Sequence, residues 1–94
     1  MGQLLYGDQP AAFEIDDRTL AHVEAVVLAK LRRNESFALT IDADHGGHDT
    51  LWLSASGTLR FAYDTAPQPL NRAWLEDLID TANSTSGMRI VAER

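Results

Sequence analysis

The sequence predicts an α+β fold, a mainly antiparallel sheet of about six strands with two helices on one face. Two segments, 16–33 and 71–82, carry apolar residues at three- and four-residue steps, the period of an amphipathic helix. Residues 36–42 alternate between apolar and polar side chains, as a half-buried strand does. With shorter strand-like segments around them, the expected order is β-β-α-β-β-β-α-β. A chain of 94 residues suffices for one modest core, so residues 1–94 are expected to form a single domain.

The first expected helix is the element that the other segments must cover. Asp16 is a good N-cap, because its carboxylate can accept a hydrogen bond from a free amide of the first turn. At the other end, Asn34 can adopt the left-handed conformation that stops a helix. The apolar residues expected on the buried face are Leu20, Val23, Val27 and Leu31.

Two short strands are expected before this helix and one directly after it. Residues 1–6 and 12–15 have strand composition, and a turn is predicted at 7–10, which contains Gly and Pro. After the helix, strand 36–42 is the clearest in the sequence. Its core-facing residues are expected to be Phe37, Leu39 and Ile41.

The next two strands, 51–55 and 59–64, are expected to form a hairpin. We predict a three-residue loop at 56–58, because this register pairs apolar residues with apolar residues. A two-residue loop would pair apolar with polar side chains. The apolar side chains that the predicted register pairs are Leu51 with Tyr63, Leu53 with Phe61 and Ala55 with Leu59.

The last third of the chain predicts a connector, a helix and a strand. Prolines make residues 66–69 an extended connector, because each disfavours helix in the residue before it. Asn71 is the expected N-cap of the second helix, Trp74 is expected in or at the edge of the core, and residues 88–92 form the final strand. The buried face of the helix is expected to comprise Leu75, Leu78, Ile79 and Ala82.

The composition is that of a soluble globular domain with an excess of acid. There are 14 Asp and Glu against 8 Lys and Arg, and the net charge of −6 disfavours non-specific binding to nucleic acid. The chain has no cysteine, which excludes disulfides, thiolate catalysis and cysteine-ligated zinc. No segment approaches the roughly 18 apolar residues of a membrane span. We therefore expect no membrane partner and a cytoplasmic location.

Four basic residues are candidate contacts for an anion or a nucleic acid: Lys30, Arg32, Arg33 and Arg72. The first three end the first helix. Arg72 starts the second, where free amides can help to hold a phosphate or carboxylate. The alternative, which the pattern favours, is that these charges only complement a helix dipole or are solvated.

The sheet face opposite the helices is the candidate interface, and it is expected to carry Trp52, Arg60, Ala62 and Val91. Apolar side chains clustered around an exposed tryptophan are typical of a surface that contacts another protein or a second copy. A homo-oligomer is therefore one expected state, and a solvated face is the alternative.

Potential metal ligands crowd the loop at 42–49, which contains Asp42, Asp44, His45, His48 and Asp49. Imidazole and carboxylate groups suit zinc, nickel or copper. A polar hairpin loop needs glycine and aspartate for its turn in any case, and the spacing matches no recognised site. We therefore predict no metal ligand and no cofactor.

No catalytic residue is predicted. His22 lies one position off the apolar face of the first helix and is interpreted as a partly buried structural histidine. The serines lack a G-x-S-x-G turn, and the chain has no Gly-rich phosphate loop. An enzyme is therefore not expected.

Three blocks of the sequence are distinctive: Asp16 to Val23, Lys30 to Phe37, and Asn71 to Glu76 running on to Ala82-Asn83-Ser84. With these blocks, nearly the whole chain resembles a family of small actinobacterial proteins of unknown function, whose members are often labelled "ATP-dependent DNA ligase". A ligase of that type accepts adenylate on a lysine in a Lys-x-Asp-Gly setting, but the only lysine, Lys30, is followed by Leu31-Arg32-Arg33. We interpret the label as a misnomer and carry over no catalytic residue.

Three functions are therefore considered. The favoured hypothesis is a non-enzymatic module that binds another protein or itself through the outer sheet face. The second is an accessory factor that contacts the phosphates of DNA or RNA. The third is a small metal- or ligand-binding protein built on His45 and His48.

Overall fold

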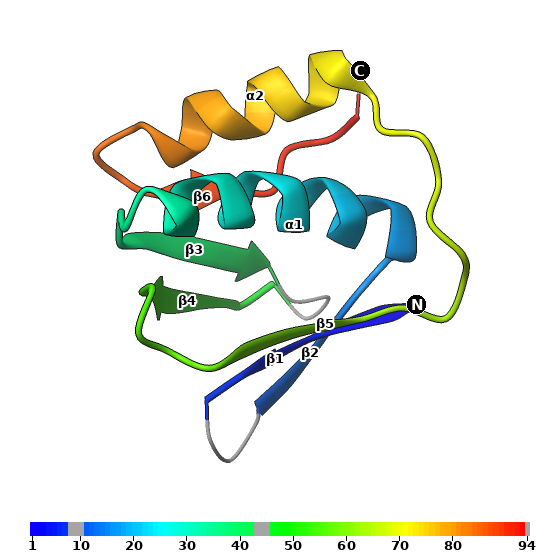
Figure 1. Ribbon diagram of the computed structural model, residues 1–94, viewed down its shortest axis with the longest axis horizontal. Helices are drawn as coiled ribbons and strands as arrows, with labels where there is room; N and C mark the ends of the chain where they lie inside the picture. The colour runs from blue at the N-terminus through cyan, green and yellow to red at the C-terminus, as the bar shows by residue number, and fades with distance from the viewer. Residues whose placement is uncertain (8–10, 43–45, 94) are drawn as a thin grey trace.

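The computed structural model describes residues 1–7, 11–42 and 46–93. These residues form an α+β fold with two helices and six strands in the predicted order (Figure 1). The elements are β1 (Gly2–Tyr6), β2 (Ala11–Ile15), α1 (Asp17–Arg32), β3 (Phe37–Asp42), β4 (His48–Leu53), β5 (Leu59–Ala62), α2 (Arg72–Ala82) and β6 (Met88–Arg89).

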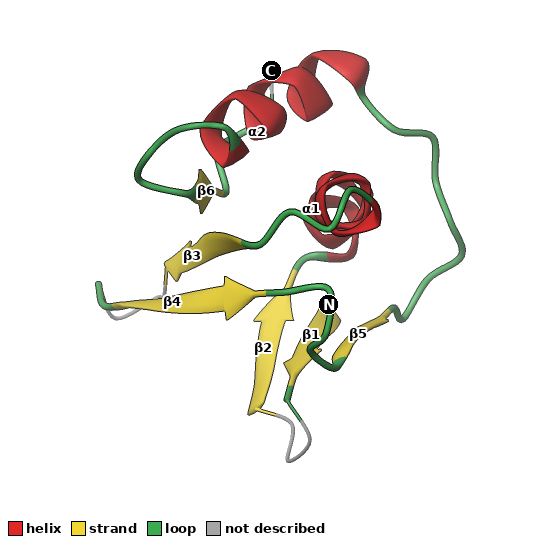
Figure 2. Cartoon of the chain, turned by 60° about the vertical axis from the view of Figure 1, so that its left-hand side comes forward, coloured by secondary structure: helices red, strands yellow, loops and turns green. Residues whose placement is uncertain are grey.

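The strands form two three-stranded sheets instead of the single sheet expected. The first has the order β2-β1-β5 and is antiparallel. The second has the order β4-β3-β6, in which β3 and β4 are antiparallel and β3 and β6 are parallel. Figure 2 shows α1 end-on, between α2 on one side and the strands on the other. The first helix is thus covered from several directions.

The predicted hairpin of residues 51–55 with 59–64 is wrong. β5 pairs with β1, so that Leu59 lies opposite Tyr6 and Phe61 opposite Leu4. This register also matches apolar with apolar residues, and it leaves β4 free to pair with β3. The strand predicted at 51–55 lies earlier in the sequence, at His48–Leu53.

The core draws on both helices and both sheets. α1 buries a wider face than predicted, adding Val26 and His22 to the expected stripe, while Leu31 is only half-buried. The predicted core face of β3 is confirmed. The largest side chains with almost no exposure are Leu4, Leu20, Leu39, Leu53, Leu78, Met88, His22, Val23 and Val27.

The buried face of α2 differs from the predicted one. Trp74, Leu78 and Ala82 are buried at four-residue steps, Leu75 is half-buried, and Ile79 is 41% exposed. α2 rests on α1, β6 and β3, which lie on its Trp74 side. The expectation that Trp74 belongs to the core is confirmed.

The two helices start and stop where side-chain chemistry predicts. Asp16 accepts a hydrogen bond from the Thr19 amide at 3.2 Å, and Asn34 has a φ of 61° just after α1. The Asn71 side chain accepts from the amides of Ala73 and Trp74 at the start of α2. Neither helix in the described ranges is both long and apolar enough to cross a membrane.

The helices run in the same direction, at an angle to each other (Figure 2), and polar contacts join them at both ends. At the start, His22 of α1 accepts a hydrogen bond from the Asn71 amide at 2.8 Å. At the other end, Lys30 Nζ donates to Asn83 Oδ1, at the C-cap of α2, at 2.6 Å. Because like ends of the two helices meet, the C-terminal turns of both face the same end of the molecule.

The C-terminal segment is held by a charged contact at the start of the helices. Arg18 donates to both carboxylate oxygens of Glu93, at 2.9 and 2.6 Å, and Asn71 Nδ2 donates to the same group at 2.9 Å. The hydrogen bonds from Arg18 have the largest effect on the pKa of Glu93, and the bond from Asn71 adds to it. Together they lower this pKa from 4.5 to about 2.

The stability of the domain is therefore expected to fall in acid as Glu93 is protonated. A carboxylate with a depressed folded-state pKa stabilises the fold above its unfolded pKa, and this stabilisation is lost as the pH falls from about 4.5 towards 2. In urea titrations at several pH values, Glu93→Gln should be less stable than wild type at pH 7 and should lose less stability below pH 4.5. Parallel acid limbs for the two proteins would contradict the assignment.

Candidate functional site

A polar groove lies on the outer face of the β4-β3-β6 sheet, between Trp52 and the loop that follows α2. Its volume is about 620 Å³. We call it the Trp52 groove. Its lining residues include Lys30, Glu35, Ala38, Trp52, Asn83 and Gly87.

The pairing of three strands creates this groove. Trp52 lies directly opposite Ala38 in the β3–β4 ladder. On the other side of Ala38, a Cβ placed on Gly87 would come within 2.9 Å of the Ala38 carbonyl oxygen. Two small residues therefore adjoin the indole, and the sheet surface next to it is hollow. Trp52 itself is 61% exposed.

Charged residues from the end of α1 form another wall of the groove. Lys30 Nζ lies 3.8 Å from Glu35 Oε1 and donates to Asn83, so its charge is held within the molecule. Glu35 Oε2 is buried and has no hydrogen-bond partner in the described part of the chain. A buried carboxylate oxygen without a donor is uncommon, because it loses its hydration without compensation. The Glu35 side chain as a whole is 43% exposed, so its carboxylate can accept from an incoming donor after a change of rotamer.

The four candidate anion contacts do not form one patch. Lys30 is engaged within the groove, whereas Arg32 and Arg33 are exposed at the end of α1. Arg72 is exposed at the opposite end of the helix pair, about 16 Å away along α2 at 1.5 Å per residue. Whether these residues bind an anion stays a prediction.

The predicted interface residues are divided between three places. Trp52 is on β4, while Arg60 and Ala62 are on β5 in the other sheet. Val91 lies in the C-terminal segment, where its carbonyl accepts a hydrogen bond from Trp74 Nε1 at 2.7 Å and its side chain packs against the core. The set was predicted on the assumption of one sheet, and two sheets separate its members.

The predicted loop of potential metal ligands falls partly outside the described residues, because Asp44 and His45 are not among them. Of its other members, His48 and Asp49 are exposed on β4. Within the described ranges, no three His, Asp or Glu residues are placed to hold one ion.

His22 is a structural residue, as predicted, although it is completely buried. Its Nδ1 lies 2.7 Å from the Arg18 carbonyl oxygen, to which it donates, and Nε2 accepts from the Asn71 amide. The ring also packs on Trp74, with ring centroids 4.3 Å apart. Both nitrogens are occupied, so the ring joins α1 to α2.

Sequence reasoning missed Glu35 and residues 83–87 as parts of a groove. The polar run 83–87 indicated only the end of a helix. One signal could have suggested a groove here. The loop that connects α2 to β6 is rich in hydroxyl groups, and it lies next to Ala38, a small residue of β3.

The fold and the groove define a small α+β domain with an exposed tryptophan beside a polar hollow. The sequence matches the family described as "Domain of unknown function (DUF7882)" over residues 1–93, and the chain belongs to this family. Comparison with curated proteins gives no match. Comparison with solved structures likewise gives none.

Proposed function

We propose that this protein is a non-enzymatic module that associates with a second copy of itself through the Trp52 groove. The proposal rests on two polar groups that line this groove and lack a hydrogen-bond partner among the described residues, one a donor and the other an acceptor. Trp52 presents an indole N–H that has no acceptor within the described ranges, and Glu35 Oε2 is a buried acceptor without a donor.

A two-fold axis can satisfy both groups at once. In an isologous interface each copy contributes the same surface, so the Trp52 of one copy enters the groove of the other and the reverse contact follows by symmetry. The indole would then bury its exposed face, and its N–H would donate to the Glu35 carboxylate of the other copy, whose side chain is 43% exposed and can change rotamer. Tryptophan in a desolvated pocket is the residue type that most often dominates such interfaces.

The position of Lys30 supports a binding role over an adenylating one. Its ammonium group is engaged with Asn83 and Glu35, and the sequence around it lacks the Lys-x-Asp-Gly setting of a ligase. This lysine therefore acts as a bridge between α1 and the C-cap of α2.

The oligomeric state tests the proposal. The untagged protein is expected to be a dimer in native mass spectrometry and in light scattering at high micromolar concentration. Trp52→Glu should weaken association by roughly 30-fold or more, the effect of losing an interface residue worth about 2 kcal/mol. The matched control is Ile79→Glu, which places the same charge at an exposed apolar residue of α2 and should leave the dimer intact.

Three results would contradict the proposal. A wild-type monomer would exclude the dimer, and an unchanged dimer in Trp52→Glu would place the interface elsewhere. The third result is nucleic acid that stays bound to the protein in native mass spectrometry. If its affinity falls steeply with salt and is reduced in a double variant of Arg32→Ala and Arg33→Ala, the accessory-factor hypothesis replaces self-association.

A further inference from the structure

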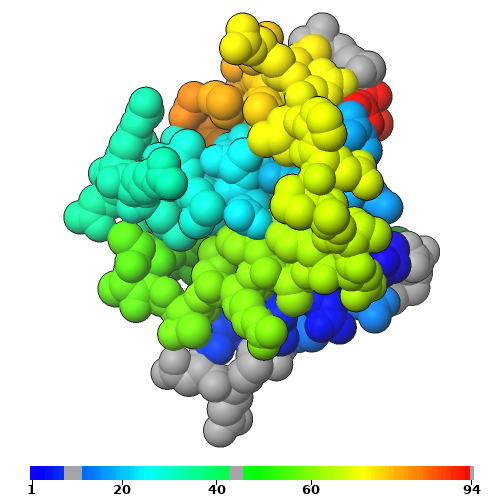
Figure 3. Space-filling model, turned by 45° about the vertical axis from the view of Figure 1, so that its right-hand side comes forward, coloured from blue at the N-terminus to red at the C-terminus, as the bar shows by residue number. Residues whose placement is uncertain are grey.

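A second cavity, separate from the Trp52 groove, lies between α1 and the segment that connects β5 to α2. Its volume is about 350 Å³, within the range of small-molecule sites. In the space-filling view the yellow-green connector forms a ridge beside the cyan α1 (Figure 3). One wall consists of four α1 residues at helical spacing, namely Asp17, Ala21, Glu24 and Ala25. Because two of the four are alanines, the wall is recessed.

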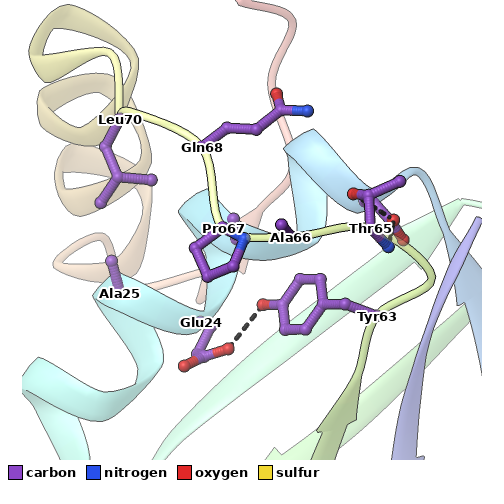
Figure 4. A pocket seen from close by; sticks show the side chains of 10 residues that line it. Glu24, Ala25, Tyr63, Thr65, Ala66, Pro67, Gln68 and Leu70 are labelled. Atoms are coloured by element: carbon purple, nitrogen blue, oxygen red, sulfur yellow. Dashed lines mark hydrogen bonds between the residues drawn. The ribbon is translucent and has the colours of Figure 1, made fainter.

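The opposite wall comes from the connector. Figure 4 shows the Leu70 side chain pointing towards Ala25 and the Pro67 ring lying next to Glu24. Five of the ten lining residues are aliphatic, namely Ala21, Ala25, Ala66, Pro67 and Leu70. The connector is held against α1 by Asp17, whose carboxylate accepts from the Thr65 amide at 2.9 Å and the Thr65 hydroxyl at 2.8 Å. These bonds also lower the pKa of Asp17.

One carboxylate in this cavity has capacity to bind. The Tyr63 hydroxyl donates a hydrogen bond to Glu24 Oε1 at 2.5 Å. Burial has the largest effect on the pKa of Tyr63 and this hydrogen bond the second largest, and both raise it, so the phenol stays protonated. Glu24 has no other partner in the parts of the chain that the structure describes. Its second oxygen therefore remains available for a donor, whereas the Asp17 carboxylate already accepts several hydrogen bonds.

The charge of the lining selects the class of ligand. Two of the ten lining residues, Asp17 and Glu24, are acidic, and none is basic. An anion would be repelled. A neutral apolar molecule would desolvate the Glu24 carboxylate without replacing its lost hydration. A cation with an aliphatic body satisfies both parts of the cavity.

We propose that this cavity binds a small aliphatic amine, whose ammonium group donates to Glu24 and whose hydrocarbon chain packs on Ala21, Ala25, Pro67 and Leu70. The Tyr63 hydroxyl fixes the position of the carboxylate by donating to its other oxygen. A charge-assisted hydrogen bond of this kind gives orientation, and the aliphatic walls give selectivity for chain length. The proposal does not depend on the function proposed for the Trp52 groove.

The test is a two-dimensional ¹H–¹⁵N NMR titration with n-butylammonium chloride at constant ionic strength. We expect saturable shifts at the amides of Ala21, Ala25 and Gln68, with a Kd on the order of 1 mM for a ligand of this size. n-Butanol and sodium butyrate have nearly the same body without the positive charge, so their binding should be at least tenfold weaker.

Two variants and one control make the titration decisive. Glu24→Gln should weaken butylammonium binding at least tenfold. The control Glu76→Gln removes the same charge from an exposed site on α2 and should have no effect. Ala25→Leu, which keeps Glu24 and fills the cavity, should abolish binding while the remaining spectrum stays that of the folded protein.

Several outcomes would overturn the proposal. They are equal binding of butanol and butylammonium, equal loss in Glu24→Gln and Glu76→Gln, and unchanged binding in Ala25→Leu. A lysine-containing pentapeptide that bound more tightly than butylammonium would also overturn the assignment to a free amine, and would identify the side chain of a partner protein as the ligand.

Discussion

Replacing His22 by alanine is expected to lower the free energy of unfolding by about 3–5 kcal/mol, the range for truncating a large buried ring. The side chain is completely buried. The variant loses the contact with Trp74, the donor to the Arg18 carbonyl oxygen and the acceptor of the Asn71 amide. Removing one partner of a buried hydrogen bond costs about 1–3 kcal/mol. For a domain of this size the total stability is only about 5–14 kcal/mol, so much of it would be lost.

Urea titration followed by circular dichroism measures this loss. The matched variant is His22→Gln, whose side-chain oxygen can still accept from the Asn71 amide, and we expect it to lose roughly half as much. If His22→Ala cost less than about 1 kcal/mol, the ring would not be the link between the two helices. If His22→Gln were as damaging as His22→Ala, packing on Trp74 would account for the whole effect.

Helix boundaries were predictable because their causes are local. Asp16 and Asn71 accept hydrogen bonds from amides two or three residues away, and Asn34 stops α1 through its own backbone conformation. Such contacts are specified by residues that are neighbours in sequence. No knowledge of the distant chain is needed to predict them.

Strand pairing was not predictable, because two registers satisfy the same pattern. Leu59 and Phe61 find apolar partners either in the predicted hairpin with 51–55 or in β1, and the structure has the second arrangement. The alternation of apolar residues determines which face of a strand is buried, but it does not select the neighbouring strand. The split into two sheets follows from this choice.

The site was predictable only in part, because the pattern of a strand or helix does not specify which distant elements lie beside it. Alternation along 51–53 placed Trp52 on an outer face, and it is exposed. Glu35 and Asn83 line the groove with it because α1 and α2 run in the same direction, so that the ends of both helices lie near the same end of β3. Helix direction depends on how the connector at 63–70 crosses the molecule, and the periodicity of the helices does not encode it.

The second large effect is expected at Gly87, where alanine should lower the free energy of unfolding by about 2–4 kcal/mol. Gly87 has a φ of 87°, a conformation that costs an L-residue about 1–2 kcal/mol. In addition, an alanine Cβ would lie 2.9 Å from the Ala38 carbonyl oxygen and 3.0 Å from Ala38 Cβ. The obstacle is the backbone of β3, which cannot move without disturbing the β3–β6 pairing.

Gly7 supplies a control that separates the two causes. Its φ of 93° is nearly that of Gly87, but no atom of the described residues lies within 4 Å of where its Cβ would be. Gly7→Ala should therefore cost only the conformational part, about 1–2 kcal/mol, in the same urea titration. Equal losses in the two variants would mean that the close approach to Ala38 carries no energy. A larger loss at Gly87, together with weaker dimerisation in Gly87→Ala but not in Gly7→Ala, would show that the Trp52 groove needs a residue without a side chain at this position.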